Sequence, residues 1–311
     1  MKSIFLKRNL TAGVCFLGVT LAPNFASACA CGCGIFDVGT SSMLPEGAGG
    51  MATVGFNFQD QNKNWNGTSS APGENNEDKK LETYTITPGL QYFFNRSWGA
   101  QISIPIVNRT FDSSDNSGSI NWTGLGDIQL KCNYTGFSDN MSSGVSLGVK
   151  LPTGSYDHTD PAGDIDRDSQ IGTGSTDLLL GAFHRGSIAG SLNWNWFGQA
   201  QLDLPVLKQG DYRPGLETDA ALGVYYEGLA VDRLEITPIG QVIGVVRGRD
   251  NGADADPDNT GYQRILLSPG VEFDLHPVKL YADVEFPVYQ NMKGNQLVAP
   301  ALFKVSLSYM F

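Results

Sequence analysis

The sequence lacks the features that mark helical membrane proteins and nucleic-acid-binding proteins. Beyond the extreme N-terminus it has no run of about 18 apolar residues, the length that a transmembrane helix needs. Basic residues number 21 against 32 acidic residues, whereas a nucleic-acid partner selects an excess of basic charge. Charged residues make up 17% of the 311 residues, against roughly 25% in an average globular domain. Both classes are therefore excluded, and no nucleic-acid partner is expected.

The N-terminus has the layout of an export signal. Lys2, Lys7 and Arg8 precede a short apolar stretch at 10–22, and Ala26-Ser27-Ala28 follows as a cleavage site of the A-x-A type. We predict that residues 1–28 are a signal peptide cut before Cys29. The cut removes three basic residues and no acidic residue, so the formal charge changes from -11 to -14.

From residue 51 onward the chain alternates between apolar and polar residues. In 192–204 one face reads Leu, Trp, Trp, Gly, Ala, Leu, Leu, and the other reads Asn, Asn, Phe, Gln, Gln, Asp. A period of two places these sets on opposite faces of a strand. Twelve such segments lie at 51–60, 82–94, 97–109, 125–135, 143–152, 175–185, 191–204, 216–226, 233–247, 262–274, 279–290 and 299–311.

These segments favour a membrane barrel over a secreted soluble β-sandwich. They run to the roughly 9–11 residues with which a tilted strand crosses a bilayer, and long and short connections alternate between them. Closing the sheet removes edges whose unpaired backbone groups would face hydrocarbon. We predict an all-β fold: a single transmembrane antiparallel up-and-down β-barrel of about twelve strands (10–14 allowed by the uncertain boundaries) over residues 51–311. Residues 29–50 form a periplasmic segment that contains cysteines.

Two motifs carry a resemblance to known outer-membrane proteins. The last strand alternates as Phe303, Val305, Leu307, Tyr309 and Phe311 and ends on Phe, which resembles the strand that the barrel assembly machinery reads. Gly124-Leu125-Gly126-Asp127-Ile128 and 148–154 resemble the outer-membrane "transporter" family named for the MetA pathway of phenol degradation.

The resemblance implies a porin-like barrel in the Gram-negative outer membrane, with periplasmic termini. The implied partners are membrane lipid, lipopolysaccharide, the assembly machinery and a small solute. The resemblance also implies passage of small, often aromatic, solutes, and it brings no catalytic residues.

If the apolar sets face lipid, the charged residues of the opposite sets line the lumen. A Lys or Arg that faced hydrocarbon near the midplane would cost about 2–4 kcal/mol. The predicted lumen-lining residues are Asp127, Lys131, Lys150, Asp177, Arg185, Asp203, Glu217, Asp219, Glu235, Arg247, Arg264, Glu272, Asp274, Asp283, Glu285 and Lys304.

These charges allow two interpretations. Ten of the sixteen are acidic, so a water-filled lumen predicts a passive, narrow, mildly cation-preferring channel for small solutes, including aromatic or hydrophobic ones. Twelve strands lie between the eight that side chains nearly fill and the sixteen to eighteen of open porins. Alternatively, acids and bases pair across the lumen and plug it, which leaves a non-conducting scaffold that binds a metal or a periplasmic partner through Cys29–Cys33.

Cys29, Cys31 and Cys33 form the sharpest local cluster. Thiolate sulfur favours copper(I) and zinc, but a single group of three cysteines lacks the paired spacing of a convincing zinc site. The periplasm is oxidising, so two of the three cysteines could equally be joined by a disulfide, and lipidation of Cys29 is a further alternative. No cofactor is assigned beyond copper or zinc at this cluster.

An enzyme is the rival class, since some outer-membrane barrels are phospholipases. A nucleophile needs a base within hydrogen-bond reach and a group that orients the base. The three histidines are His158, His184 and His276, and we expect no Ser beside them with an Asn or Asp in register. We therefore predict no enzymatic activity.

The metal-ligand interpretation of the cysteines makes a direct prediction. Copper or zinc should copurify with the exported protein and be lost when Cys29, Cys31 and Cys33 are all replaced by Ser, because thiolates are the ligands that these metals prefer. Elemental analysis of both proteins measures this, with Cys132→Ser as the matched control. Equal metal content in the triple variant would remove the cluster as a ligand set.

Overall fold

The computed structural model describes residues 44–45, 47–114, 118–159 and 165–311. The predicted signal peptide and Cys29, Cys31 and Cys33 lie outside the described residues. Within those ranges, no helix is both long and apolar enough to cross a membrane.

In the part of the chain that the structure describes, the fold is a sheet of seventeen strand segments with two short 3-10 turns, η2 (Gly73–Asn75) and η3 (Arg167–Ser169). The strands are β1 (Gly49–Gln61), β2 (Lys63–Gly67), β3 (Ser69–Ser70), β4 (Asp78–Phe93), β5 (Trp98–Ser103), β6 (Ile106–Ser113), β7 (Ile120–Leu125), β8 (Gln129–Tyr134), β9 (Ser143–Lys150), β10 (Thr176–Ser187), β11 (Trp194–Leu207), β12 (Glu217–Tyr226), β13 (Leu229–Val231), β14 (Leu234–Arg247), β15 (Tyr262–Leu275), β16 (Val278–Val298) and β17 (Leu302–Met310).

These segments build a closed antiparallel barrel of twelve staves, where a stave is one strand or two consecutive strand segments that occupy one position around the barrel. β5 and β6 form one stave because both pair with β4, and β7 and β8 form the next. The order around the barrel is β1, β4, β5/β6, β7/β8, β9, β10, β11, β12, β14, β15, β16 and β17. Antiparallel pairing of β17 with β1, from Met51↔Met310 to Gln59↔Leu302, closes it. The predicted all-β, twelve-stranded up-and-down barrel is confirmed.

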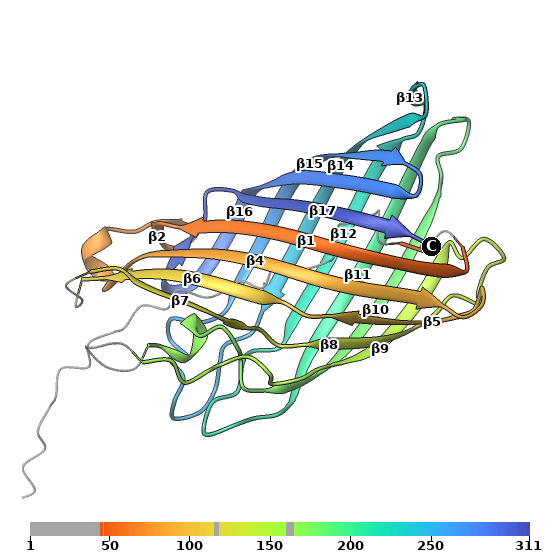
Figure 1. Cartoon of the computed structure of the whole chain (residues 1–311). Helices are drawn as coiled ribbons and strands as arrows, with labels where there is room; N and C mark the ends of the chain where they lie inside the picture. Colours follow the sequence, from red (N-terminus) through yellow and green to blue (C-terminus); the bar gives the residue numbers. More distant parts are fainter. Residues whose placement is uncertain (1–43, 46, 115–117, 160–164) are drawn as a thin grey trace, which may run out of the picture.

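The two ends of the barrel differ. β1 begins and β17 ends at one end, where the connections are short; we call it the short-turn end (Figure 1). The connections at the opposite, long-loop end include 151–175, 208–216 and 248–261. The alternation of long and short connections expected from the sequence is therefore present.

Apolar side chains face outward and polar side chains face inward. On β12, Leu222 is 62% exposed and Asp219 is fully buried. The two are three residues apart, and this odd separation places them on opposite faces of the strand. The outer aromatic rings pair at the short-turn end, as in Trp98–Tyr134, with centroids 4.8 Å apart, and Trp194–Tyr226, at 5.1 Å. An outer apolar face bounded by aromatic rings is the surface that a bilayer solvates.

The lumen also contains an apolar cluster, which the predicted polar interior did not include. Phe197 is fully buried and packs with Ile239, Ile243 and Leu266. A Cβ on Gly223 would lie 2.4 Å from the Phe197 ring, so only glycine on β12 leaves room for the ring. Aromatic and aliphatic side chains therefore line the part of the lumen that is formed by β11 to β17.

Three strand boundaries differ from the sequence expectation. The segment 97–109 is broken at residues 104–105, where Pro105 has no N–H to pair, and its neighbour is broken at 126–128. The expected loop at 291–298 is largely strand. β16 bends at Gly294, whose φ is +67°, and the residues after the bend pair with β2.

The outward-facing side chains predict a depth-dependent response to charge. Leu222→Arg, near the middle of β12, should destabilise the barrel in lipid by about 2–4 kcal/mol, whereas a cationic side chain near the interface costs about 0–1 kcal/mol. The matched control is Leu275→Arg, at the short-turn end of β15, because Leu275 is also outward-facing at 53% exposure. Denaturant unfolding in liposomes measures both. Equal effects of the two substitutions would contradict the assignment of the outer face.

Candidate functional site

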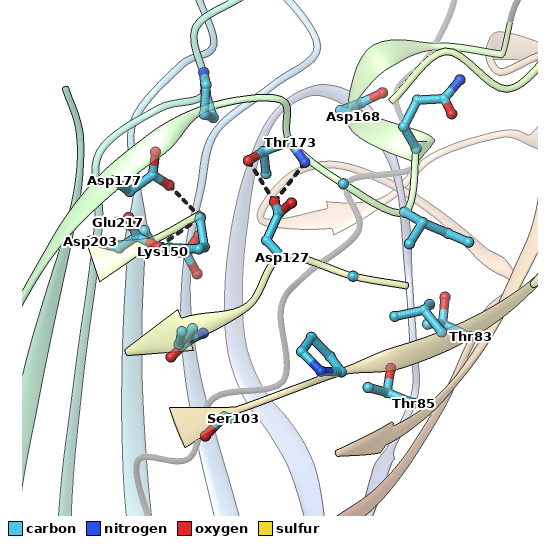
Figure 2. A pocket seen from close by; sticks show the side chains of 18 of the residues that line it. Thr83, Thr85, Ser103, Asp127, Lys150, Asp168, Thr173, Asp177, Asp203 and Glu217 are labelled. Atoms are coloured by element: carbon cyan, nitrogen blue, oxygen red, sulfur yellow. Dashed lines mark hydrogen bonds and ion pairs between the residues drawn. The ribbon is translucent and has the colours of Figure 1, made fainter. Parts of the chain in front are cut away.

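The lumen holds a cavity of about 200 Å³ near the long-loop end, which we call the long-loop chamber. Two opposite walls and a roof of loop residues enclose it (Figure 2). The charged wall contains Lys150, Asp177, Asp203, Glu217 and Arg247. The hydroxyl wall contains Asn57, Thr83, Thr85, Thr87 and Ser103.

The charged wall is a row across five neighbouring staves, β9, β10, β11, β12 and β14. Lys150 stands opposite Asp177, and Asp203 stands opposite Glu217. Lys150 Nζ forms an ion pair with Asp177 and lies 2.9 Å from Asp203 Oδ2. Buried charges are stable only when they are paired, and here Lys150 and Arg247 stand at the two ends of the row and flank its three carboxylates.

The described parts of the loop after β9, residues 151–159 and 165–175, fold inward and roof the chamber. The Asp127 carboxylate anchors the loop, accepting hydrogen bonds from Gly154 N, Thr173 N and Thr173 Oγ1, each 2.9 Å long. Arg109 of β6 donates to the carbonyl of Gln170 at 2.8 Å and to that of Ser169. The loop is therefore tied to the barrel wall from two sides.

A second roof forms around Asp250, which is fully buried. Its carboxylate accepts hydrogen bonds from Tyr212 Oη at 2.6 Å, Gly215 N at 2.7 Å and Arg247 at 2.9 Å. Burial, followed by the nearby Asp250 charge, raises the pKa of Tyr212 well above its ordinary value, so the phenol stays protonated and donates. Asp250 thus joins the 208–216 and 248–261 loops.

Two further cavities continue the lumen toward the short-turn end. A middle cavity of about 90 Å³ shares Lys131 and Gln201 with the long-loop chamber. Lys131 Nζ donates a 2.7 Å hydrogen bond to Gln201 Oε1, so this pair lies at the boundary between the two cavities. We call it the Lys131–Gln201 partition.

The last cavity, of about 420 Å³, reaches the short-turn end and is called the terminal cavity. It shares Leu44, Pro45, Gln91 and Phe93 with the middle cavity. Leu44 is 8% exposed and packs in the apolar cluster of the lumen, and Arg185 donates to the Pro45 carbonyl at 2.8 Å. Residues from before the first strand therefore lie inside the barrel.

The other predicted lumen residues lie mostly on β12 and β15–β17. Asp219, Arg264, Glu272, Asp283, Glu285 and Lys304 are each at most 9% exposed, and Asp274 is partly buried. Lys304 lies 3.4 Å from Glu285, and Lys279 lies 3.2 Å from Asp274. Glu235 differs from the expectation, because it is exposed at the short-turn end of β14.

Several functional residues were missed by the sequence reasoning. Arg109 and Lys279 have the inward parity of their strands, Lys279 sharing it with Asp283, so the alternation that gave the other charges could have found them. Tyr212 and Asp250 lie in loops, where no period predicts the direction of a side chain.

One of the three histidines has a serine neighbour. Ser143 Oγ and His184 Nδ1 lie 2.6 Å apart on neighbouring strands, so a Ser does stand beside a His. Both residues are on the exposed side of the wall or at its edge, and the His184 ring packs against Trp196 at a centroid distance of 5.2 Å. In the described part of the chain no carboxylate or amide hydrogen-bonds to His184, so the third member of a catalytic triad is missing.

The described residues contain no group of three or more His, Cys, Asp or Glu that could hold a metal ion. Cys132 is exposed and has no disulfide partner among them. The copper or zinc expectation concerns Cys29, Cys31 and Cys33, which are outside the described residues.

Comparisons with known proteins agree with this architecture. Residues 60–299 match the family model described as "Putative MetA-pathway of phenol degradation", and no curated protein sequence matches the chain. The fold is similar to that of the COG4313 outer membrane channel from Pseudomonas putida F1, with a TM-score of 0.62, 13% identity, and coverage of 89% of this chain and 100% of that chain. It is also similar to the β domain of the Bordetella autotransporter BrkA, with a TM-score of 0.53, 14% identity, and coverage of 85% and 100%. At 13–14% identity these matches show similarity of fold.

The geometry around Asp250 predicts a specific loss of loop order. Asp250→Asn should lower the free energy of unfolding by about 3 kcal/mol, since hydrogen bonds to charged groups contribute about 1.5–3 kcal/mol each. Proteases should then cut the 208–216 loop faster than in the parent protein. The matched control is Asp258→Asn, because the side chain of Asp258 is 91% exposed. Unchanged cleavage of the 208–216 loop in Asp250→Asn would contradict the anchoring role.

Proposed function

Because this chain belongs to the family of the putative MetA pathway of phenol degradation, we propose that it is a passive, narrow channel for small solutes in the Gram-negative outer membrane. The observation that carries the proposal is the row of three cavities, each sharing lining residues with the next. A lumen that was simply packed would not contain adjoining cavities from the long-loop side to the short-turn end. The name of the similar barrel, an outer membrane channel, supports the same function.

The bore is narrow for two physical reasons. Twelve strands enclose less space than the sixteen to eighteen strands of open porins. Loop residues 165–175, which Asp127 and Arg109 hold, occupy part of that space. Solutes that pass are therefore small. The family resemblance adds aromatic or hydrophobic solutes as a class, and Phe93 and Phe183 of the middle cavity offer apolar surface for them.

A mild preference for cations follows from the charges inside the barrel. Lys150 and Arg247 are matched by carboxylates, whereas the Asp283 carboxylate is held by the neutral side chains of Gln241, Ser268 and Tyr281. Uncompensated carboxylates attract cations into a low-dielectric pore.

We place the termini in the periplasm and the long loops outside the cell, where lipopolysaccharide would contact them. Short periplasmic turns and long outer loops are the arrangement of bacterial barrels. The side chains of Phe303, Val305, Leu307, Tyr309 and Phe311 all face outward. Such a strand can be read by the barrel assembly machinery before the barrel closes, and we assign it that role.

The alternative is a non-conducting scaffold, and the paired charges together with Leu44 inside the lumen favour it over other classes. In that case the Cys29–Cys33 segment binds copper or zinc or engages a periplasmic partner. The two functions differ in one measurable property, which is solute flow through the purified barrel.

Planar-bilayer recording tests the channel. The full chain should conduct, and in a KCl gradient the reversal potential should indicate a preference for K⁺ over Cl⁻. Lys131→Ala should raise the conductance by about twofold or more, because it removes a side chain at the boundary between two cavities and conductance follows the pore lining. The matched control, Lys208→Ala, removes the same charge from an exposed loop position and should leave conductance unchanged.

Silence of the parent protein and of Lys131→Ala, both shown to be folded, would contradict the channel and leave the scaffold. If the parent protein conducts and Lys131→Ala has the same conductance, the channel function would stand. The Lys131–Gln201 partition would then not be its constriction.

A further inference from the structure

The hydroxyl wall of the long-loop chamber has hydrogen-bonding groups that the described residues do not use. Asn57 is 7% exposed and Thr83 is 4% exposed, yet neither Asn57 Oδ1 nor Thr83 Oγ1 has a hydrogen-bond partner. Most buried polar groups in proteins are hydrogen-bonded, and leaving one unpaired costs about 1–3 kcal/mol. Both residues line the chamber, so a molecule inside it would lie beside these unpaired groups.

The wall is built by strand parity and register. Thr83, Thr85 and Thr87 are alternate residues of β4 and all line the chamber. Asn57 of β1 stands opposite Thr85, and Ser103 of β5 stands opposite Gly89. Three adjacent staves therefore present a patch of hydroxyl and amide groups to one side of the same space.

The opposite wall supplies further acceptors. Asp203 is 8% exposed, and its Oδ1 has no hydrogen-bond partner although Oδ2 is paired with Lys150. Figure 2 shows Thr83, Thr85 and Ser103 on one side of the chamber and the Lys150–Asp177–Asp203 group on the other. A molecule between them would meet hydrogen-bonding groups at both ends.

The charges around the chamber balance. Its basic lining residues are Arg109, Lys131, Lys150, Arg167 and Arg247, and its acidic ones are Asp127, Asp168, Asp177, Asp203 and Glu217. With five of each sign, an ion of either charge meets both attraction and repulsion and must also lose its hydration. An uncharged molecule avoids the desolvation cost of a buried ion.

The volume limits the size of that molecule. A cavity of about 150 Å³ holds benzene, so about 200 Å³ accommodates a molecule of roughly the size of a five- or six-carbon compound. Hydroxyl groups on it would take over the hydrogen bonds of water in the chamber, since displacing ordered water is favourable only when its bonds are reproduced.

We propose that the long-loop chamber is a binding site for a small, uncharged solute that carries several hydroxyl groups, such as a polyol. Asn57, Thr83 and Asp203 hydrogen-bond its hydroxyl groups, and Thr85, Thr87 and Ser103 extend the same surface. The inference rests on the proposed channel function, because it names a class of solute that the channel would select. It differs from the aromatic class that the family resemblance implies.

Equilibrium dialysis of the full chain in detergent against labelled xylitol tests the site without requiring conduction. Xylitol should bind saturably, and unlabelled 1,5-pentanediol and xylonate should compete more weakly, because the first has fewer hydroxyl groups and the second is charged. The variants are Thr83→Val and Asn57→Leu, which remove the free groups and keep similar volume. Each should weaken binding by about threefold to tenfold, the loss expected for one hydrogen bond.

The matched control is Thr218→Val, which makes the same change on an exposed position of β12 and should leave binding unchanged. Heat-modifiable migration of each protein shows that it is folded. If Thr83→Val does not fold, competition by the three solutes on the parent protein still decides the matter.

Several outcomes would overturn the site: no saturable xylitol binding, equal binding by Thr83→Val and Thr218→Val, or saturable binding of phenol in place of xylitol. Liposome swelling separates this failure from that of the channel. Swelling with small solutes but no xylitol binding would contradict only the binding site. Xylitol binding without any swelling or conductance would contradict only the channel.

Discussion

The rest of the structure depends on the alternation of side chains between hydrocarbon and the lumen. Because successive residues of a strand point to opposite faces, every strand that crosses the bilayer must send each second side chain inward. In hydrocarbon the backbone must also be fully paired, so the sheet closes through β1 and β17. These two constraints place polar groups in a confined interior, where they must bind each other, water or a solute.

The interior meets that demand in different ways along its length. The Lys150, Asp177 and Asp203 group satisfies charge by pairing, and Phe197 with its glycine neighbour fills space with apolar surface. Loops complete the enclosure, since Asp127 and Asp250 draw segments of the long-loop end into contact with the wall. What remains open is a series of small cavities, which is the arrangement expected of a selective pore rather than of a wide one.

The sequence alone predicted the strands of the barrel, but it did not predict the contacts that loops and N-terminal residues make inside it. Strand parity is local, so the outward set of 303–311 and the inward charges Asp203 and Glu217 could be read from period two alone. The break at Pro105 and the bend at Gly294 needed pairing partners from other strands. The inward position of loop residues 165–175 and the burial of Asp250 depend on contacts between distant segments, and Leu44 lies in the lumen although no strand pattern surrounds it in the sequence.

Single spin labels at five consecutive positions of β4, residues 83–87, in a background without cysteine would follow the two faces of the barrel wall residue by residue. Collision with oxygen reports hydrocarbon, and deuterium modulation of the echo in heavy water reports contact with water. We expect oxygen contact to peak at positions 84 and 86, and water contact to peak at 83, 85 and 87. Equal values along the strand, or dry labels at all three inward positions, would contradict a barrel with a wet chamber behind its lipid-facing wall.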